Sequence, residues 1–151
     1  MARDRTALAL VLACGAAWGA GGCRKAAGGK PDPAAGTPLA SKPFYRVDAG
    51  PAAACAHGAT CEVRLVLTAL GDHHINQDYP FKFVGEPAPA PPVDGEGVFA
   101  IDDARHGTMT VKFHPAAAGT ATLAGTFKLC VCSDETCEIE TPRIELAVPV
   151  S

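Results

Sequence analysis

The sequence predicts an all-β domain that is preceded by a signal peptide and a flexible tether. From residue 44 onward, apolar residues recur at every second position in several short runs, the pattern of strands with one buried face. Turn-forming glycines and prolines separate these runs, and no segment shows a convincing helical stripe. About seven short strands with frequent turns are typical of an immunoglobulin-like antiparallel β-sandwich.

The N-terminal segment, residues 1–22, is typical of an export signal. A short charged stretch precedes an uncharged run of mostly Ala, Leu and Gly that is too short for a membrane span. Small residues stand directly before Cys23, as in a bacterial lipobox, although Ala20 occupies the usual leucine position. We therefore expect cleavage before Cys23 and lipidation of this cysteine. The alternatives are cleavage at an ordinary alanine site and an uncleaved anchor. A lipobox at Cys14 is disfavoured, because it would leave an apolar region of only about six residues.

The rest of the chain divides into a linker and one domain. Residues 23–43 comprise the lipidated cysteine and a disordered linker rich in Ala, Gly and Pro, and residues 44–151 form the β-sandwich domain. The formal charge of −3 and the lack of a basic stripe argue against nucleic-acid binding. We expect a monomer in the bacterial cell envelope that is anchored to the membrane through the lipid at Cys23 and faces the periplasm.

The expected strands follow one another along this domain. Four runs show clear alternation of apolar and polar residues: 62–69, 108–114, 126–132 and 144–150. Three shorter runs are also expected to be strands: 45–47, 81–84 and 98–101. The proline-rich stretch 86–92 must be an extended loop, and Pro149 places the last strand at a sheet edge or ends it there, since proline cannot donate to a ladder.

Three cysteines cluster where the run 126–132 ends. With Phe127, Leu129 and Val131 facing the core, Cys130 and Cys132 share the outward face. The following turn brings Cys137 back beside Cys132, so these two are expected to form a disulfide. A Cys130–Cys132 bond would strain an extended strand, because alternate residues lie about 6.5–7 Å apart.

Cys55 and Cys61 form a second local pair just before strand 62–69, which we interpret as a structural disulfide. Loops of this length stabilise by only about 2 kcal/mol, so neither local pair is an efficient staple. Two such pairs leave Cys130 without a partner, and an alternative bond to Cys137 would make the cluster a three-thiol switch. The acidic residues after Cys132 disfavour a thiolate, which would make the couple relatively reducing.

The run 127–139, Phe-Lys-Leu-Cys-Val-Cys-Ser-Asp-Glu-Thr-Cys-Glu-Ile, resembles the N-terminal periplasmic domain of the thiol:disulfide interchange protein DsbD and the related disulfide-bond corrector domains. The run 72–83, Asp-His-His-Ile-Asn-Gln-Asp-Tyr-Pro-Phe-Lys-Phe, is similar to the Gly-x-His-Ile-Asn-x-x-Tyr-Pro region of that group. The family loop is often one residue longer, and Cys130 is an additional cysteine.

This resemblance implies an immunoglobulin-like domain that receives electrons from a membrane partner and passes them to periplasmic oxidoreductases. The cysteines at the matching positions are Cys132 and Cys137. We expect a freestanding lipoprotein version that exchanges thiols and disulfides without a cofactor, with Cys132 favoured as the attacking sulfur. The resemblance also makes the segment 79–81 a candidate hydrophobic cover for the disulfide.

Two alternatives remain open. The first is a non-enzymatic envelope or interaction module whose disulfides are purely structural. The second is a copper or zinc site, in which the clustered cysteines would be joined by other soft or nitrogen ligands: His73, His74, His106, His114 and Met109.

Overall fold

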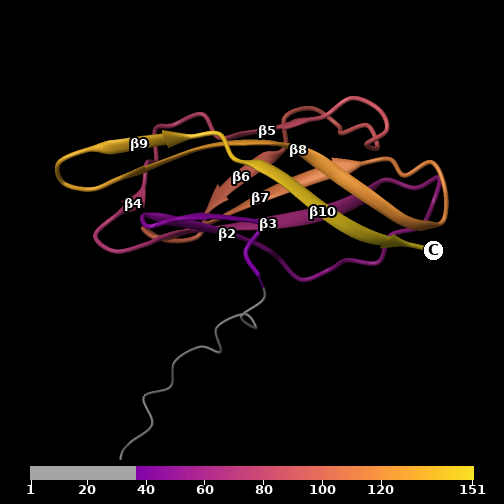
Figure 1. The fold of residues 1–151 in the computed structure, drawn as a ribbon, viewed down its shortest axis with the longest axis horizontal. Coiled ribbons are helices and arrows are strands. Elements are labelled where there is room, and N and C mark those ends of the chain that lie inside the picture. Colours follow the sequence, from indigo (N-terminus) through magenta and orange to yellow (C-terminus); the bar gives the residue numbers. More distant parts are fainter. Residues whose placement is uncertain (1–36) are drawn as a thin grey trace, which may run out of the picture. The chain divides into compact units, whose positions relative to one another are not determined.

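The computed structural model describes residues 37–151 (Figure 1). The predicted signal peptide, Cys23 and residues 24–36 of the predicted linker lie outside this range. Within it the chain forms ten strands, all paired antiparallel, and no helix, which confirms the all-β prediction. Among these residues no helix is therefore long and apolar enough to cross a membrane.

One sheet contains five strands in the order β1-β2-β3-β7-β6. Their bounds are Ala40–Lys42 (β1), Tyr45–Ala49 (β2), Cys61–Ala69 (β3), Val98–Ile101 (β6) and His106–Phe113 (β7). Strand β1 lies inside the predicted linker, so the folded part begins earlier than residue 44. The reason is that residues 40–42 pair backbone to backbone with β2, which needs no large apolar side chain.

The second sheet is built around the long strand β8 (Gly119–Cys132). Its other members are β4 (His74–Ile75), β5 (Lys82–Gly85), β9 (Cys137–Glu140) and β10 (Arg143–Val150), and each of them pairs with β8. Residues 125–126 of β8 lie between β10 and β5, whereas residues 131–132 lie between β4 and β9. Strand β10 is at the edge, as Pro149 predicts.

Apolar side chains from both sheets form one core. The alternation predicted for β3, β7 and β8 is confirmed, because the inward positions are buried. The largest fully buried side chains are Tyr45, Leu65, Leu67, Met109 and Phe113 from the first sheet and Ile75, Phe83, Leu123, Phe127, Leu129 and Ile144 from the second. Burial of a side chain of this size contributes about 1.5–3 kcal/mol, so this core holds the sheets together.

Gly125 on β8 allows β5 to pack closely against the central strand. A Cβ atom at this position would lie 2.5 Å from the ring of Phe83 and 2.6 Å from the carbonyl oxygen of Val84. Val84 and Gly125 belong to the paired strands themselves, so this contact cannot relax without a shift of the ladder.

We expect Gly125→Ala to lower the free energy of unfolding by about 1–3 kcal/mol, the usual effect of overpacking a core. Gly85→Ala is the matched control, because its added methyl meets the side chain of Val93 at 2.7 Å rather than backbone. Urea unfolding followed by circular dichroism measures both. A loss at Gly125 smaller than at Gly85 would show that β5 does not depend on this close approach.

Candidate functional site

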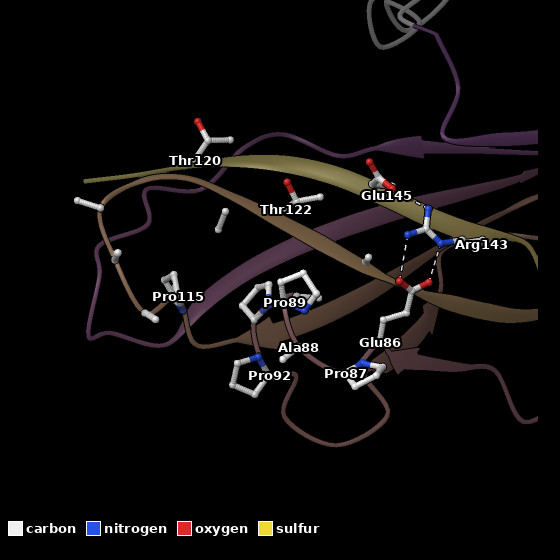
Figure 2. Close-up of a pocket in the computed structure, with 17 residues that line it drawn as sticks. Glu86, Pro87, Ala88, Pro89, Pro92, Pro115, Thr120, Thr122, Arg143 and Glu145 are labelled. Carbon is white, nitrogen blue, oxygen red and sulfur yellow. Dashed lines mark hydrogen bonds and ion pairs between the residues drawn. The ribbon is translucent and has the colours of Figure 1, made fainter.

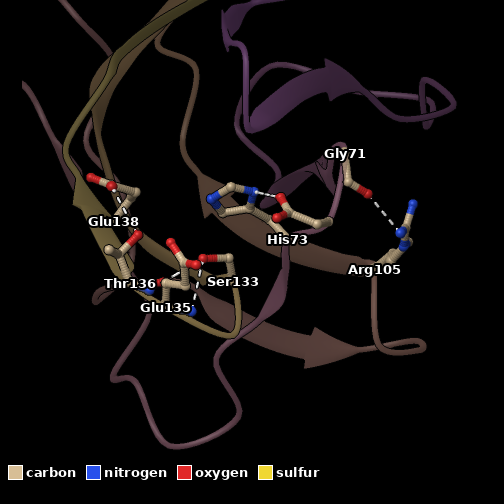
Figure 3. Close-up of polar contacts among 8 residues, drawn as sticks. Gly71, His73, Arg105, Ser133, Glu135, Thr136 and Glu138 are labelled. Carbon is tan, nitrogen blue, oxygen red and sulfur yellow. Dashed lines mark hydrogen bonds and ion pairs between the residues drawn. The ribbon is translucent and has the colours of Figure 1, made fainter.

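The cysteine cluster lies where β8 turns into β9, in a hairpin closed by residues 133–136. The Ser133 amide donates to the Thr136 carbonyl at 2.8 Å. The Ser133 hydroxyl accepts the amide hydrogens of Glu135 at 3.3 Å and Thr136 at 3.2 Å (Figure 3). One serine thus holds the whole turn, and the turn sets the register of the residues on either side.

Cys132 and Cys137 are direct neighbours across this hairpin and form a disulfide. Their Cα atoms are 4.0 Å apart, because they form the close pair next to the hydrogen-bonded Ser133–Thr136 pair. The predicted pairing is therefore confirmed. The two sulfur-bearing residues differ in access, since Cys132 is only 6 % exposed whereas Cys137 lies on the surface.

Cys130 is a free cysteine on the same face of β8. The sulfur atoms of Cys130, Cys132 and Cys137 all lie within 4.8 Å of one another. The predicted outward face of Cys130 and Cys132 is not open to solvent, because both residues are buried and Cys130 is only 1 % exposed. Alternation assigns them to the face opposite Leu129 correctly, but the chain after β4 also occupies that face.

Asn76, two residues beyond His74, is the residue that links this segment to the cysteines. Its amide hydrogen donates to the Cys130 carbonyl at 3.2 Å, which extends the β4–β8 pairing. Its side-chain nitrogen lies 3.7 Å from the Cys130 sulfur and 3.5 Å from the Cys132 sulfur. The side-chain oxygen accepts the Asp78 amide at 2.9 Å, which orients the amide group. Asn76 lies in the segment that resembles the DsbD domain, but no sequence pattern predicts its contact with the cysteines.

The surroundings of Cys130 raise the pKa of its thiol above the ordinary value. Burial is the largest cause, because it disfavours the charged thiolate, and the negative charge of Glu138 acts in the same direction. The hydrogen bond from Asn76 opposes both. Cys130 is therefore a neutral thiol at neutral pH while the neighbouring disulfide is intact.

Three of the histidines proposed as metal ligands have carboxylate partners. His73 lies 2.9 Å from the Asp72 carboxylate (Figure 3), His106 lies 2.9 Å from Asp103, and His114 lies 2.8 Å from Asp94. Within residues 37–151, the one cluster with metal-ligand geometry contains the three cysteines alone.

Two further candidate ligands are positioned by their strands. His74 is exposed and stands opposite Cys132 in the β4–β8 ladder, so its side chain emerges on the cysteine face. Met109 is fully buried in the core.

The aromatic segment 79–81 packs against β6. The rings of Tyr79 and Phe81 meet edge to face with centroids 5.3 Å apart, and Phe81 stacks on Phe99 at 3.9 Å. These contacts place the segment against β6, the edge strand of the first sheet. Its role as a cover for the disulfide stays a prediction.

The Cys55–Cys61 disulfide closes the loop before β3, and hydrogen bonds hold the C-terminus against this loop. Both cysteines are buried in the core, and their pairing confirms the prediction. The carbonyl of Cys55 accepts hydrogen bonds from the amide and the hydroxyl of Ser151, at 2.9 and 3.1 Å. This environment is that of a structural crosslink.

A groove of about 740 Å³ lies at the other end of β8, between the proline-rich loop 86–92 and the turn 115–118 (Figure 2). Its walls are mostly proline, alanine and threonine, and the guanidinium of Arg143 is held by Glu86 and Glu145, each at 2.6 Å. Thr122 in the groove is ten residues from Cys132, about 33 Å along an extended strand. The groove therefore does not belong to the cysteine site.

Comparison with known proteins identifies no relative: no family model, no curated protein and no solved structure matches this chain.

We expect a maleimide to label Cys130 at least about tenfold more slowly in the native protein than in denaturant, since a buried neutral thiol reacts poorly. The labelling rate should rise only at a pH above the one at which an ordinary thiol becomes reactive, because the pKa of Cys130 is raised. Mass spectrometry of the Cys130 peptide measures both effects. Equal labelling rates in the folded and unfolded states would contradict the buried position.

Proposed function

We propose that the protein is an exported lipoprotein, anchored through Cys23 and facing the periplasm, that exchanges electrons with envelope proteins through Cys132 and Cys137. The observation that carries this proposal is the asymmetry of the disulfide. One sulfur belongs to an exposed residue, and the other is buried beside an amide donor. The resemblance of residues 72–83 and 127–139 to the DsbD domain supports the same chemistry.

In the proposed exchange, a partner thiolate attacks the sulfur of Cys137, because Cys132 is shielded. The S–S bond breaks, its electron pair leaves with Cys132 as a thiolate, and a mixed disulfide joins Cys137 to the partner. A second thiol of the partner then attacks the partner's sulfur in the mixed disulfide and releases Cys137. The partner dithiol is thereby oxidised to a disulfide, and the Cys132–Cys137 disulfide is reduced to two thiols. The same steps run in reverse when the protein donates electrons. This assignment replaces Cys132 by Cys137 as the first sulfur to react.

Asn76 has a defined task in this scheme. Its side-chain amide is 3.5 Å from the Cys132 sulfur, which is the leaving group, and is already oriented by Asp78. A hydrogen bond to a charged sulfur is stronger than one to a neutral sulfur, so this donor stabilises the thiolate more than the disulfide. Asn76 therefore favours opening of the bond.

The surface around Cys137 indicates the kind of partner. Residues 133–140 contain four carboxylates, of which Glu140 is paired with Lys42. Ile139, two positions from Cys137 on the same strand, is 64 % exposed. A partner with basic residues and an apolar patch around its reactive cysteine complements this surface.

Trapping tests the exchange directly. Cys130→Ser/Cys132→Ser leaves only the exposed Cys137 in the cluster and should accumulate a mixed disulfide with an envelope thiol oxidoreductase, seen on a non-reducing gel. The matched variant Cys130→Ser/Cys137→Ser leaves the buried Cys132 and should trap little. A reduction potential far below about −300 mV without any adduct would instead support a structural disulfide.

Asn76→Ala should make the couple more reducing by about 10–30 mV, because an ordinary hydrogen bond contributes about 0.5–1.5 kcal/mol and 30 mV corresponds to about 1.4 kcal/mol. Equilibration with dithiothreitol buffers measures the potential. Asp78→Ala is the control, since Asp78 orients Asn76 through its backbone amide. An unchanged or less negative potential in Asn76→Ala would remove the proposed role of this donor.

A further inference from the structure

We propose that the sulfurs of Cys130, Cys132 and Cys137 form a three-coordinate Cu(I) site once the disulfide between Cys132 and Cys137 has been reduced. This adds a metal-binding function to the proposed exchange and accounts for Cys130, which the exchange does not use. It shares with that proposal only the opening of the disulfide.

The distances fit such a site with little movement. The three sulfurs lie within 4.8 Å of one another while the disulfide is intact. With metal–sulfur bonds of about 2.3 Å, the sulfurs of a trigonal site are about 4 Å apart. Cys132 and Cys137 separate to this distance when their bond breaks, and Cys130 has to approach by less than about 1 Å, which a side-chain adjustment supplies.

The backbone around the cluster is suited to holding three ligands in place. Cys130 and Cys132 are alternate residues on the central strand, so their side chains emerge from the same face. Cys137 faces them from β9, which the Ser133 turn keeps in register. The ligands therefore come from two paired strands rather than from mobile loops.

Asn76 provides the outer contacts that metal–thiolate sites require. Its side-chain nitrogen lies within hydrogen-bonding range of two of the three sulfurs, at 3.7 and 3.5 Å. Such donors fix the orientation of the ligands and offset their negative charge. The carboxamide has no other partner for its nitrogen among the hydrogen bonds of the described residues, whereas its oxygen is held by Asp78.

The donor set selects a soft cation of low coordination number. Thiolates favour Cu(I) and zinc over hard ions. Structural zinc almost always takes four ligands, but within residues 37–151 the cluster supplies three, because His74, although on the same face, lies outside it, and His73, His106 and His114 have carboxylate partners. The remaining histidine, His57, is not a member of the cluster either, and its ring contacts the Ser151 carbonyl. Three sulfurs without a fourth ligand match Cu(I).

Loading of the site takes two reactions, reduction of the disulfide and binding of the metal. A dithiol donor first supplies two electrons and two protons, which convert the disulfide into two thiols, and the donor becomes a disulfide. The three thiols then bind one Cu(I) ion and release up to three protons, giving a complex with a formal charge of −2. Metal binding itself transfers no electrons.

Anaerobic titration with Cu(I) against the chromophoric competitor bicinchoninate tests the site. The full chain should carry Cys14→Ser and Cys23→Ser, which removes two thiols outside the described residues, and should be reduced with a phosphine that is then removed. We expect one Cu(I) ion per chain and X-ray absorption showing three sulfur neighbours at about 2.3 Å. Chemical reduction keeps this result independent of whether any protein partner exchanges with the disulfide.

Variants in the same background separate this site from other thiols. Cys130→Ser should weaken Cu(I) binding by more than about 100-fold, beyond the range of outer-contact substitutions, and Asn76→Ala should weaken it by about 10–100-fold. Cys55→Ser/Cys61→Ser keeps the cluster and should retain the affinity. Circular dichroism verifies that each variant is folded, and Cys137→Ser, at an exposed position, repeats the test should Cys130→Ser fail to fold.

Three results would overturn the proposal. The first is an affinity of a folded Cys130→Ser or Cys137→Ser variant within about threefold of the parent. The second is loss of binding in Cys55→Ser/Cys61→Ser alone, which would move the site to the other cysteine pair. The third is tight binding of Zn²⁺ with no binding of Cu(I).

Discussion

The pairing of strand β8 with four neighbours is the constraint on which the rest of the structure depends. Fourteen residues of this strand form the centre of one sheet, and β4, β5, β9 and β10 are all defined by their register with it. The register also determines which side chains of β8 face the core. Because side chains alternate along a strand, a shift of one residue would send Cys130 and Cys132 into the core and remove Leu129 and Val131 from it. The core therefore fixes the cysteine face.

The burial of that face gives the cysteines their chemical character. An outward pair on an open sheet would be solvated and equivalent, whereas here Asn76 reaches the sulfurs of Cys130 and Cys132 from one side and Cys137 is left on the surface. The two ends of one disulfide thus meet different environments. A bond with one accessible and one shielded sulfur has a preferred direction of attack, which the proposed exchange requires, whereas both cysteines of the Cys55–Cys61 crosslink are enclosed.

Sequence alone predicts those features that depend on neighbours along the chain. The alternation in residues 126–132 predicts both the strand and the Cys132–Cys137 pair, because a short hairpin returns the chain to the adjacent position. The contact of Cys130 with Asn76 joins residues 54 positions apart, so no local pattern could reveal it. Strands β1 and β4 have only three and two residues, too few to show any periodicity. The first half of β8 carries small residues and acquires its structure from β10.

The two proposed activities follow from one property of the cluster: it contains three sulfur atoms, and a disulfide uses only two of them. In the oxidised state two sulfurs are bonded and Cys130 stays a protonated thiol, which is compatible with burial. Reduction leaves the thiols of Cys130 and Cys132 in a buried space that offers one amide as a donor, where free thiolates are poorly solvated, while Cys137 lies at the surface. Formation of a new S–S bond or of metal–sulfur bonds therefore stabilises the cluster relative to its reduced, metal-free state. Return of the electrons to a partner restores the S–S bond, and capture of a soft cation replaces it with three metal–sulfur bonds. Which of these follows depends on whether the reduced protein first meets an oxidised partner or a Cu(I) ion.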